Sequence, residues 1–313
     1  MTSAFVFPGQ GSQAVGMGKE LAAAFAEARE VFGEVDEALK QNLSALMFDG
    51  PGETLTLTEN AQPALMAVSM AILKVLEKQS NVTVRSAARY VAGHSLGEYA
   101  ALAAAGALSL ADTARLLKIR GQAMQKAVPV GEGAMAALLG LDLPQVQEVA
   151  VEASVGGLIC ATANDNAPGQ VVVSGHKAAV DKAIELAKAR GAKRAMVLPV
   201  SAPFHCPLMK PAADVMAEAL SNVAIKSPVV PLIANVTAAT VIEPDEIRRL
   251  LVEQVTAMVR WRESVIAMKD TGVDLLVEVG AGKVLTRMTK RIVEGVESIS
   301  LQGPQDIEAF LKR

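Results

Sequence analysis

One pentapeptide constrains the fold of this chain more than any other feature: Gly93-His94-Ser95-Leu96-Gly97. The apolar run before it predicts a strand, and the helical pattern from Leu96 to about Ala105 predicts a helix after it. A serine in such a strand-to-helix turn stands clear of the sheet, at a helix N-terminus whose free N–H groups favour negative charge. Ser95 is therefore a candidate nucleophile. The alternative is a glycine-rich turn with a capping serine.

Strands alternate with helices along most of the remaining chain, which predicts an α/β fold with a mostly parallel sheet. Strands are expected at 4–7, 90–92 and 274–279. The last element is predicted to be a helix that follows Gly280-Ala281-Gly282. The other long helices are expected at 21–32, ended by Gly33, at 62–76, with Gln62-Pro63 in its first turn, at 110–127 and at 244–258.

A different order of elements fills residues 131–198. Strand, helix, strand, strand, helix and strand follow one another there, which is the ferredoxin-like arrangement. Three prolines within 201–211 then return the chain to the larger unit. We therefore expect a small domain of residues 131–198, inserted into a large domain formed by residues 1–130 and 199–313.

Composition narrows the class of protein. Hydrophobic residues make up 51% of the 313 residues and charged residues 20%, as in compact soluble enzymes. A net charge of -3 gives no general reason to expect nucleic acid or an anionic membrane as a partner. The cysteines, Cys160 and Cys206, have no metal-ligand spacing, so no metal site is expected. The absence of a secretory signal or an uninterrupted apolar span predicts a cytoplasmic protein.

A serine nucleophile needs a general base, which is usually histidine. The side chain of His94 should point away from its neighbour Ser95, and His176 opens a helix whose dipole opposes an imidazolium. His205 lies in a proline-rich loop between the two domains and is the best candidate, although a lone histidine can be purely structural. No acid stands out as a third member, and a backbone carbonyl could orient the ring instead. The acids between Ser95 and His205 that lack a distinctive context include Asp112, Asp142, Asp165 and Asp181.

Arg120 lies on the apolar face of the helix expected at 110–127. A cation on that face must meet an anion, because an unpaired buried charge is costly. The partner could be a protein carboxylate. It could also be a substrate carboxylate, which the planar guanidinium would grip with two hydrogen bonds.

Two glycine-rich loops fail as nucleotide motifs. Gly9-Gln10-Gly11 lacks the second strand and the acid of a dinucleotide fingerprint, and in Gly280-Ala281-Gly282-Lys283 the next residue is Val284, where a phosphate loop needs Ser or Thr. The first loop could instead present N–H groups to an oxyanion, one from Gln10 and one from Leu96, the residue after the candidate nucleophile. A plain tight turn remains the alternative.

Several motifs occur in one order along nearly the whole chain. Together they resemble the malonyl-CoA:acyl carrier protein transacylase family, the acyltransferases of fatty acid synthesis that also occur within polyketide synthases. The one small departure is Ala281, where relatives often have proline. The motifs that carry the resemblance are Phe5-Val6-Phe7-Pro8-Gly9-Gln10-Gly11-Ser12-Gln13, Gly93-His94-Ser95-Leu96-Gly97-Glu98-Tyr99, Arg120-Gly121, Phe204-His205 and Val277-Glu278-Val279-Gly280.

The resemblance implies a large domain like that of the α/β-hydrolases and a ferredoxin-like small domain. It implies Ser95 as nucleophile, His205 as base and Arg120 as the clamp on the malonyl carboxylate. The remaining roles that it implies are an oxyanion hole of the Gln10 and Leu96 amides, a main-chain carbonyl of Gln254 that orients the histidine, His94 and Gln62 as pocket residues, and Phe204 as the malonyl-selective residue.

The implied substrate is malonyl-CoA, with no bound cofactor, and the implied partner is phosphopantetheinylated acyl carrier protein. Carrier proteins are acidic, so a basic docking face is expected, although such clusters can be plain solvated surface. A serine hydrolase or thioesterase and a non-catalytic carrier-docking module are the alternatives. The two candidate docking clusters are Lys283, Arg287, Lys290 and Arg291 on the predicted last helix, and Lys188, Arg190, Lys193 and Arg194 on the small domain.

Overall fold

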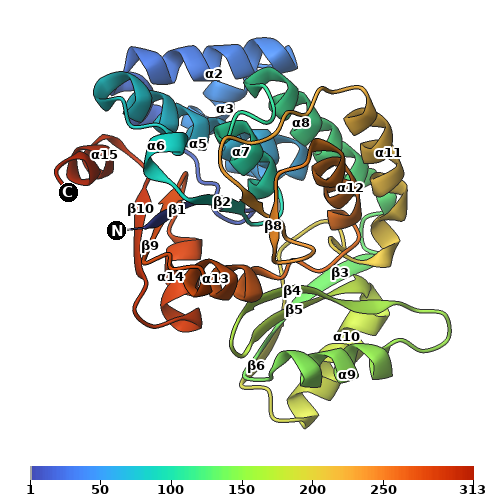
Figure 1. Cartoon of the computed structure of the whole chain (residues 1–313). Coiled ribbons are helices and arrows are strands. Elements are labelled where there is room, and N and C mark those ends of the chain that lie inside the picture. Colours follow the sequence, from blue (N-terminus) through green and yellow to red (C-terminus); the bar gives the residue numbers. More distant parts are fainter. Residues whose placement is uncertain (1) are drawn as a thin grey trace.

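The computed structural model describes residues 2–313, so Met1, the first residue of the predicted large domain, lies outside the described residues. The chain forms two separate sheets (Figure 1). In the larger sheet, with the order β10-β9-β1-β2-β7-β8, every pair is parallel except β7 with β8. The predicted α/β fold with a mostly parallel sheet is therefore confirmed. Its strands are β1 (Ser3–Phe7), β2 (Tyr90–Gly93), β7 (Leu232–Ile233), β8 (Thr240–Val241), β9 (Leu275–Val279) and β10 (Glu297–Leu301).

The second sheet is antiparallel and has the order β4-β5-β3-β6, which is the ferredoxin-like strand order expected for this segment. Its two helices lie together below the sheet in Figure 1. Residues of this unit form an apolar core of their own, separate from the main core. Its elements are β3 (Gly133–Leu139), α9 (Leu143–Ala153), β4 (Cys160–Ala167), β5 (Gln170–His176), α10 (Lys177–Ala189) and β6 (Arg194–Val197).

The remaining helices surround the parallel sheet. The 23-residue helix α5 is buried on nearly all sides, as its apolar composition predicts. Among residues 2–313 no helix is both long and apolar enough to cross a membrane. The helices are α1 (Lys19–Ala24), α2 (Ala26–Leu39), α3 (Leu43–Asp49), α4 (Gly52–Thr56), α5 (Thr58–Ser80), α6 (Val84–Ala87), α7 (Gly97–Ala104), α8 (Leu110–Ala127), η1 (Pro207–Met209), α11 (Lys210–Ser221), α12 (Pro244–Gln254), α13 (Trp261–Asp270), α14 (Val284–Ile292) and α15 (Pro304–Leu311).

Two predicted helix boundaries near the N-terminus are wrong. The helix expected at 21–32 is interrupted by the extended backbone of Phe25 and then runs through Gly33 to Leu39. The apolar face continues at the buried Val35, and its burial outweighs the cost of about 1 kcal/mol for a glycine inside a helix. Helix α5 begins at Thr58 rather than at Gln62, which places Pro63 in the second turn.

Two predictions in the C-terminal third are also wrong. Helix α12 ends at Gln254 instead of Met258, and after a short turn Val259 pairs with β4. The N–H of Val259 donates to the carbonyl of Ala163 at 2.9 Å, and the N–H of Asp165 donates to the carbonyl of Val259 at 3.0 Å. The helix after Gly282 is not the last element, since β10 and α15 follow it.

The pairing of β4 with Val259 fastens the antiparallel unit to the parallel one. Asp165 lies beside this contact, is 1% exposed in its side chain, and forms an ion pair with Arg262 of α13 at 2.8 Å. Three consecutive residues of β4 lie at this junction, because Asn164 lines the cavity described next and Asn166 is hydrogen-bonded to His94.

Candidate active site

The turn between β2 and α7 holds Ser95 in a left-handed backbone conformation, with φ at 55°. The turn requires glycine on both sides of it, because there is no space for a Cβ atom at either position. A Cβ atom on Gly93 would lie 1.9 Å from the carbonyl of Gly97, and one on Gly97 would lie 2.2 Å from the carbonyl oxygen of Phe7. The tight strand-to-helix turn expected from the sequence is thus present, and it presents the serine at the carboxyl end of the parallel sheet.

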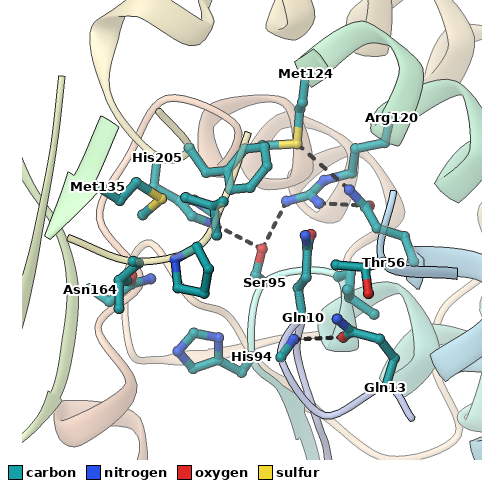
Figure 2. A pocket seen from close by; sticks show the side chains of 17 residues that line it. Gln10, Gln13, Thr56, His94, Ser95, Arg120, Met124, Met135, Asn164 and His205 are labelled. Carbon is teal, nitrogen blue, oxygen red and sulfur yellow. Dashed lines mark hydrogen bonds between the residues drawn. The ribbon is translucent and has the colours of Figure 1, made fainter. Parts of the chain in front are cut away.

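Ser95 and His205 meet although 110 residues separate them. The serine hydroxyl donates to Nε2 of the imidazole at 2.7 Å, as Figure 2 shows. On the other side of the ring, Nδ1 donates to the main-chain carbonyl of Gln254 at 2.9 Å. A carbonyl can only accept, so the proton of the neutral ring lies on Nδ1 and Nε2 is free to accept the serine proton.

His205 is neutral at physiological pH. Burial, assisted by the nearby positive charge of Arg120, lowers its pKa to about 3. No carboxylate of residues 2–313 contacts the ring, so the main-chain carbonyl of Gln254 takes the place that an acid has in many serine enzymes.

Arg120 reaches the same point from α8 and is 1% exposed. One of its terminal nitrogens donates to the side-chain oxygen of Gln62 at 2.8 Å. The other donates to the hydroxyl of Ser95 at 3.1 Å and to the side-chain oxygen of Gln254 at 2.9 Å. Its guanidinium carbon also lies 5.6 Å from the ring centre of Tyr99.

No carboxylate within residues 2–313 forms an ion pair with Arg120, and its Nε has no hydrogen-bond partner among them. All of its hydrogen bonds go to neutral oxygens. A buried guanidinium surrounded by neutral acceptors is suited to receive an anion from outside the protein.

These side chains open into a cavity of about 440 Å³. Leu96 caps α7, and no hydrogen bond from its N–H or from that of Gln10 is formed within residues 2–313. The side chain of Gln10 is held by the hydroxyl of Thr58 at 2.8 Å. These two N–H groups, which have no partner among the described residues, are the kind of hydrogen-bond donors that stabilise an oxyanion. The cavity is lined by Gln10, Gly11, Gln13, Thr56, Gln62, His94, Ser95, Leu96, Arg120, Met124, Met135, Asn164, Leu198, Pro199, Val200, Phe204 and His205.

His94 lies on the cavity wall but is not positioned as a base. Its Nε2 is hydrogen-bonded to the side-chain oxygen of Asn166 at 2.8 Å, and its ring lies 5.8 Å from that of Trp261. Burial lowers its pKa below the usual histidine value. Phe204 and Gln62 also line the cavity, where the resemblance places them.

Sequence reasoning missed two polar residues behind the serine. Asn235 accepts a hydrogen bond from the N–H of Ser95 at 2.8 Å and donates to the carbonyl of Gly93 at 2.6 Å, so it clamps the strained turn. It lies in a loop after β7 with no local signal. Glu98 is 1% exposed and accepts from the N–H of Asn235 at 3.0 Å. Glu98 stands in a motif of the family resemblance, but no role was assigned to it. Its apolar neighbours on α7 were a further signal, since a charged side chain among apolar residues is a candidate for burial with a partner.

The two basic clusters lie on exposed surface, and none of their residues lines the cavity. Two members are already engaged within the chain. Arg291 contacts the loop between β4 and β5 through the carbonyl of Pro168 at 3.2 Å and through Gln170. Arg190 forms ion pairs with Glu148 at 2.9 Å and Glu152 at 2.5 Å. The cations that form no ion pair or side-chain hydrogen bond within residues 2–313 are Lys283, Arg287, Lys290, Lys188, Lys193 and Arg194.

A two-unit α/β fold with a serine, a histidine and a buried arginine at one cavity defines a class of acyl-transferring serine enzymes. The chain belongs to the acyl transferase domain family, whose model matches residues 4–307. It is 47% identical over 309 residues to the malonyl CoA-acyl carrier protein transacylase of Bacillus subtilis, covering 99% of this chain and 96% of the relative.

Solved structures agree with this assignment. The acyl-carrier-protein S-malonyltransferase of Bartonella henselae is 54% identical and superposes with a TM-score of 0.97, covering 100% of this chain and 99% of the other. A malonyl transacylase in complex with its type II polyketide synthase acyl carrier protein is 42% identical, with a TM-score of 0.96 and coverage of 100% and 99%.

Proposed function

We propose that this protein transfers the malonyl group of malonyl-CoA to the phosphopantetheine thiol of acyl carrier protein through a malonyl-serine intermediate. The observation that carries the proposal is Arg120, a buried cation that donates to the hydroxyl of Ser95 and has no carboxylate partner within residues 2–313. A serine nucleophile alone is compatible with any acyl group. A guanidinium beside it favours an acyl group that ends in a carboxylate.

The reaction begins when Ser95 attacks the thioester carbonyl and His205 accepts the hydroxyl proton at Nε2. The oxyanion of the tetrahedral intermediate receives hydrogen bonds from the N–H groups of Gln10 and Leu96. The carbonyl of Gln254 holds the protonated ring in place. Coenzyme A then leaves as the thiol, taking the proton from His205, and a malonyl ester remains on Ser95.

The second half repeats these steps with the carrier thiol as the nucleophile. His205 takes the thiol proton, the new thioester forms, and Ser95 recovers its hydroxyl. The kinetics are therefore ping-pong. These steps use only side chains and amides of the chain, so the proposal includes no cofactor. We also propose that the protein is cytoplasmic, because malonyl-CoA and acyl carrier protein are substrates of cytoplasmic enzymes.

We also propose the domain division that places this site. Residues 1–130 and 199–313 form the catalytic domain, and residues 131–198 form the small domain, which contributes Met135, Asn164 and Leu198 to the cavity. Phe204 narrows the cavity beside the acyl group and favours malonyl over bulkier acyl groups. The exposed cations of α14 and of the small domain are the candidate docking surface for the acidic carrier.

A serine hydrolase or thioesterase is the competing function. It would use the same serine and histidine but would gain nothing from Arg120 beside the hydroxyl. Comparing malonyl-CoA hydrolysis with transfer to carrier protein distinguishes the two, and we expect transfer to dominate.

The direct test is the intact mass of the protein after brief exposure to malonyl-CoA. We expect the addition of one malonyl group, its loss on addition of carrier protein, and no addition in the Ser95→Ala variant. A wild-type protein that remains unmodified, or is modified equally in Ser95→Ala, would refute the proposal.

A further inference from the structure

Glu98 is a buried carboxylate that the proposed reaction does not use. It lies on the first turn of α7, close behind Ser95 (in Figure 1, α7 follows β2). One of its oxygens accepts from the N–H of Asn235 at 3.0 Å and from the side-chain amide of Gln254 at 2.9 Å. An ionised carboxylate at such a depth needs a cation nearby, and the cation whose field acts on it is Arg120.

A single amide joins the two charges. The side chain of Gln254 donates through Nε2 to Glu98 and accepts through its oxygen from Arg120 at 2.9 Å. A carboxylate can only accept and a guanidinium can only donate, so the amide satisfies both in this orientation alone. Glu98 therefore orients Gln254 and, through it, the guanidinium, yet it leaves Arg120 without a direct ion pair.

The other titratable groups of this cluster are neutral. Burial raises the pKa of Tyr99, the next residue on α7, to about 12. Burial lowers the pKa values of His205, in the loop before η1, and of His94, in the turn before α7. Arg120 and Glu98 are thus the two groups that can carry formal charge in the cluster. Burial raises the pKa of Glu98 to about 7, which makes its charge exchangeable near neutral pH.

We propose that Glu98 is an exchangeable counter-charge of Arg120: near neutral pH it exchanges its proton with solvent when no acyl carboxylate is present, and it stays protonated when the malonyl carboxylate binds the guanidinium. The inference rests on the proposed function. One guanidinium balances one buried carboxylate, so a second carboxylate leaves an excess negative charge that is removed most readily by protonating Glu98. One proton moves from solvent to the Glu98 carboxylate, and no other bond changes. Glu98 is a positioning residue, because it acts through Gln254.

Proton uptake measured during acylation tests this directly. The protein is mixed with malonyl-CoA or acetyl-CoA in weakly buffered solution at about pH 7 with a pH indicator, and the acyl-serine formed is counted by intact mass. The thiol of coenzyme A stays protonated in both reactions, because an ordinary thiol, such as that of cysteine, has a pKa of about 8.5. Because Glu98 is partly ionised near neutral pH before the reaction, we expect uptake of part of one proton per malonyl-serine and none per acetyl-serine.

Two variants sharpen the result. Glu98→Gln keeps an acceptor oxygen but cannot titrate, so it should form malonyl-serine without proton uptake. The matched control is Glu278→Gln, which alters another buried glutamate with a raised pKa, one that accepts from the N–H groups of Leu285 and Thr286 at the start of α14. This control should retain the uptake.

Equal uptake with both acyl groups, no uptake with malonyl-CoA, or uptake that persists in Glu98→Gln would overturn the proposal. If Glu98→Gln does not fold, the comparison of the two acyl groups on the wild-type protein still decides. A wild-type protein that forms no malonyl-serine at all would refute the proposed function instead, so the two failures are distinguishable.

Discussion

His205 is oriented by a main-chain carbonyl, and the consequences begin at that single contact. A neutral acceptor stabilises an imidazolium less than an aspartate does, and the positive charge of Arg120 opposes it further. The ring is therefore a weak base in the resting protein. It gains a proton only when the oxyanion of the intermediate forms close by and supplies the compensating negative charge.

The lowered pKa of His205 predicts the acid side of the pH profile. A histidine with an ordinary pKa of about 6.5 would be half protonated, and so half inactive as a base, at pH 6.5. A pKa of about 3 keeps the ring neutral throughout the mildly acidic range. We expect kcat/KM for malonyl-CoA at pH 5.5 to be no lower than about one third of its value at pH 7.5, and protonation of Glu98 over this range should raise it. A decline that tracks a single group near pH 6.5 would contradict this assignment of the base.

Removing the guanidinium should separate charged from uncharged acyl groups. In Arg120→Ala we expect malonyl transfer to fall by about 100-fold or more, because hydrogen bonds between charged groups are lost. Acetyl transfer, which makes no such contact, should fall much less. Single-turnover acylation with the two CoA esters measures both, and equal losses would exclude a role for Arg120 in acyl selection.

The sequence predicted the residues of this site that carry a local signature and missed those that do not. Ser95 is marked by its glycines, and Arg120 by its place on an apolar helix face. Asn235 and Glu98 support the same turn through contacts between segments 137 residues apart, and no local pattern encodes such a contact. The interaction between Gln254 and His205 was implied only by resemblance, since a main-chain acceptor leaves no mark in the residue type.

At the scale of elements, the turn between β2 and α7 depends on close packing of main chain against main chain. Gly97 lies so near the end of β1 that a methyl group would have to displace the Phe7 carbonyl, 2.2 Å away. Gly33, in contrast, lies in the exposed middle of α2, where a methyl group would meet nothing within 4 Å. The same substitution should therefore have opposite effects at the two positions.

We expect Gly97→Ala to lower the free energy of unfolding by about 3 kcal/mol or more and to abolish acylation of Ser95. The matched variant Gly33→Ala should raise the free energy of unfolding by about 0.5–1 kcal/mol, because alanine restricts the unfolded chain and favours a helical backbone. Urea denaturation of both proteins gives the comparison. A mild effect at Gly97 would mean that the turn is far more plastic than its geometry implies.

Helix existence was predictable and helix ends were not. The exception is the helix expected from Leu110 to about Ala127, which agrees with α8 at both ends because Ser109 caps its start and its apolar residues follow the helical period. The end of α12 was missed because Val259 pairs with β4, a strand almost one hundred residues earlier in the chain. Tertiary pairing of that kind overrides local helix propensity.

At the scale of the whole molecule, the antiparallel unit is fastened to the parallel one beside the active site. The ion pair of Asp165 with Arg262 and the hydrogen bond of Asn166 with His94 lie on the same strand, β4. The position of the cavity wall therefore depends on the contact between the two units. The division into two units was predictable from the order of elements, but this fastening required the fold.

We expect Arg262→Ala to destabilise the protein by about 2 kcal/mol or more, because it leaves the buried carboxylate of Asp165 without its partner. It should also raise KM for malonyl-CoA by loosening the cavity wall. Arg249→Ala is the matched control, since it removes two exposed ion pairs, with Glu246 and Glu253, that solvent screening makes weak. Similar effects of the two substitutions on stability and KM would argue against a fastening role.

The acceptor that holds His205 belongs to the peptide bond after Gln254, so no codon change at that position can delete it. Replacing Gln254 with alanine will consequently measure only the effect of losing the amide side chain, which binds Arg120 and Glu98. The contact between the main-chain carbonyl and the imidazole will remain. Only replacement of the following amide by an ester, which weakens the carbonyl as an acceptor, would probe it. This contact depends on the path of the backbone, so it persists through side-chain substitutions that leave the fold intact.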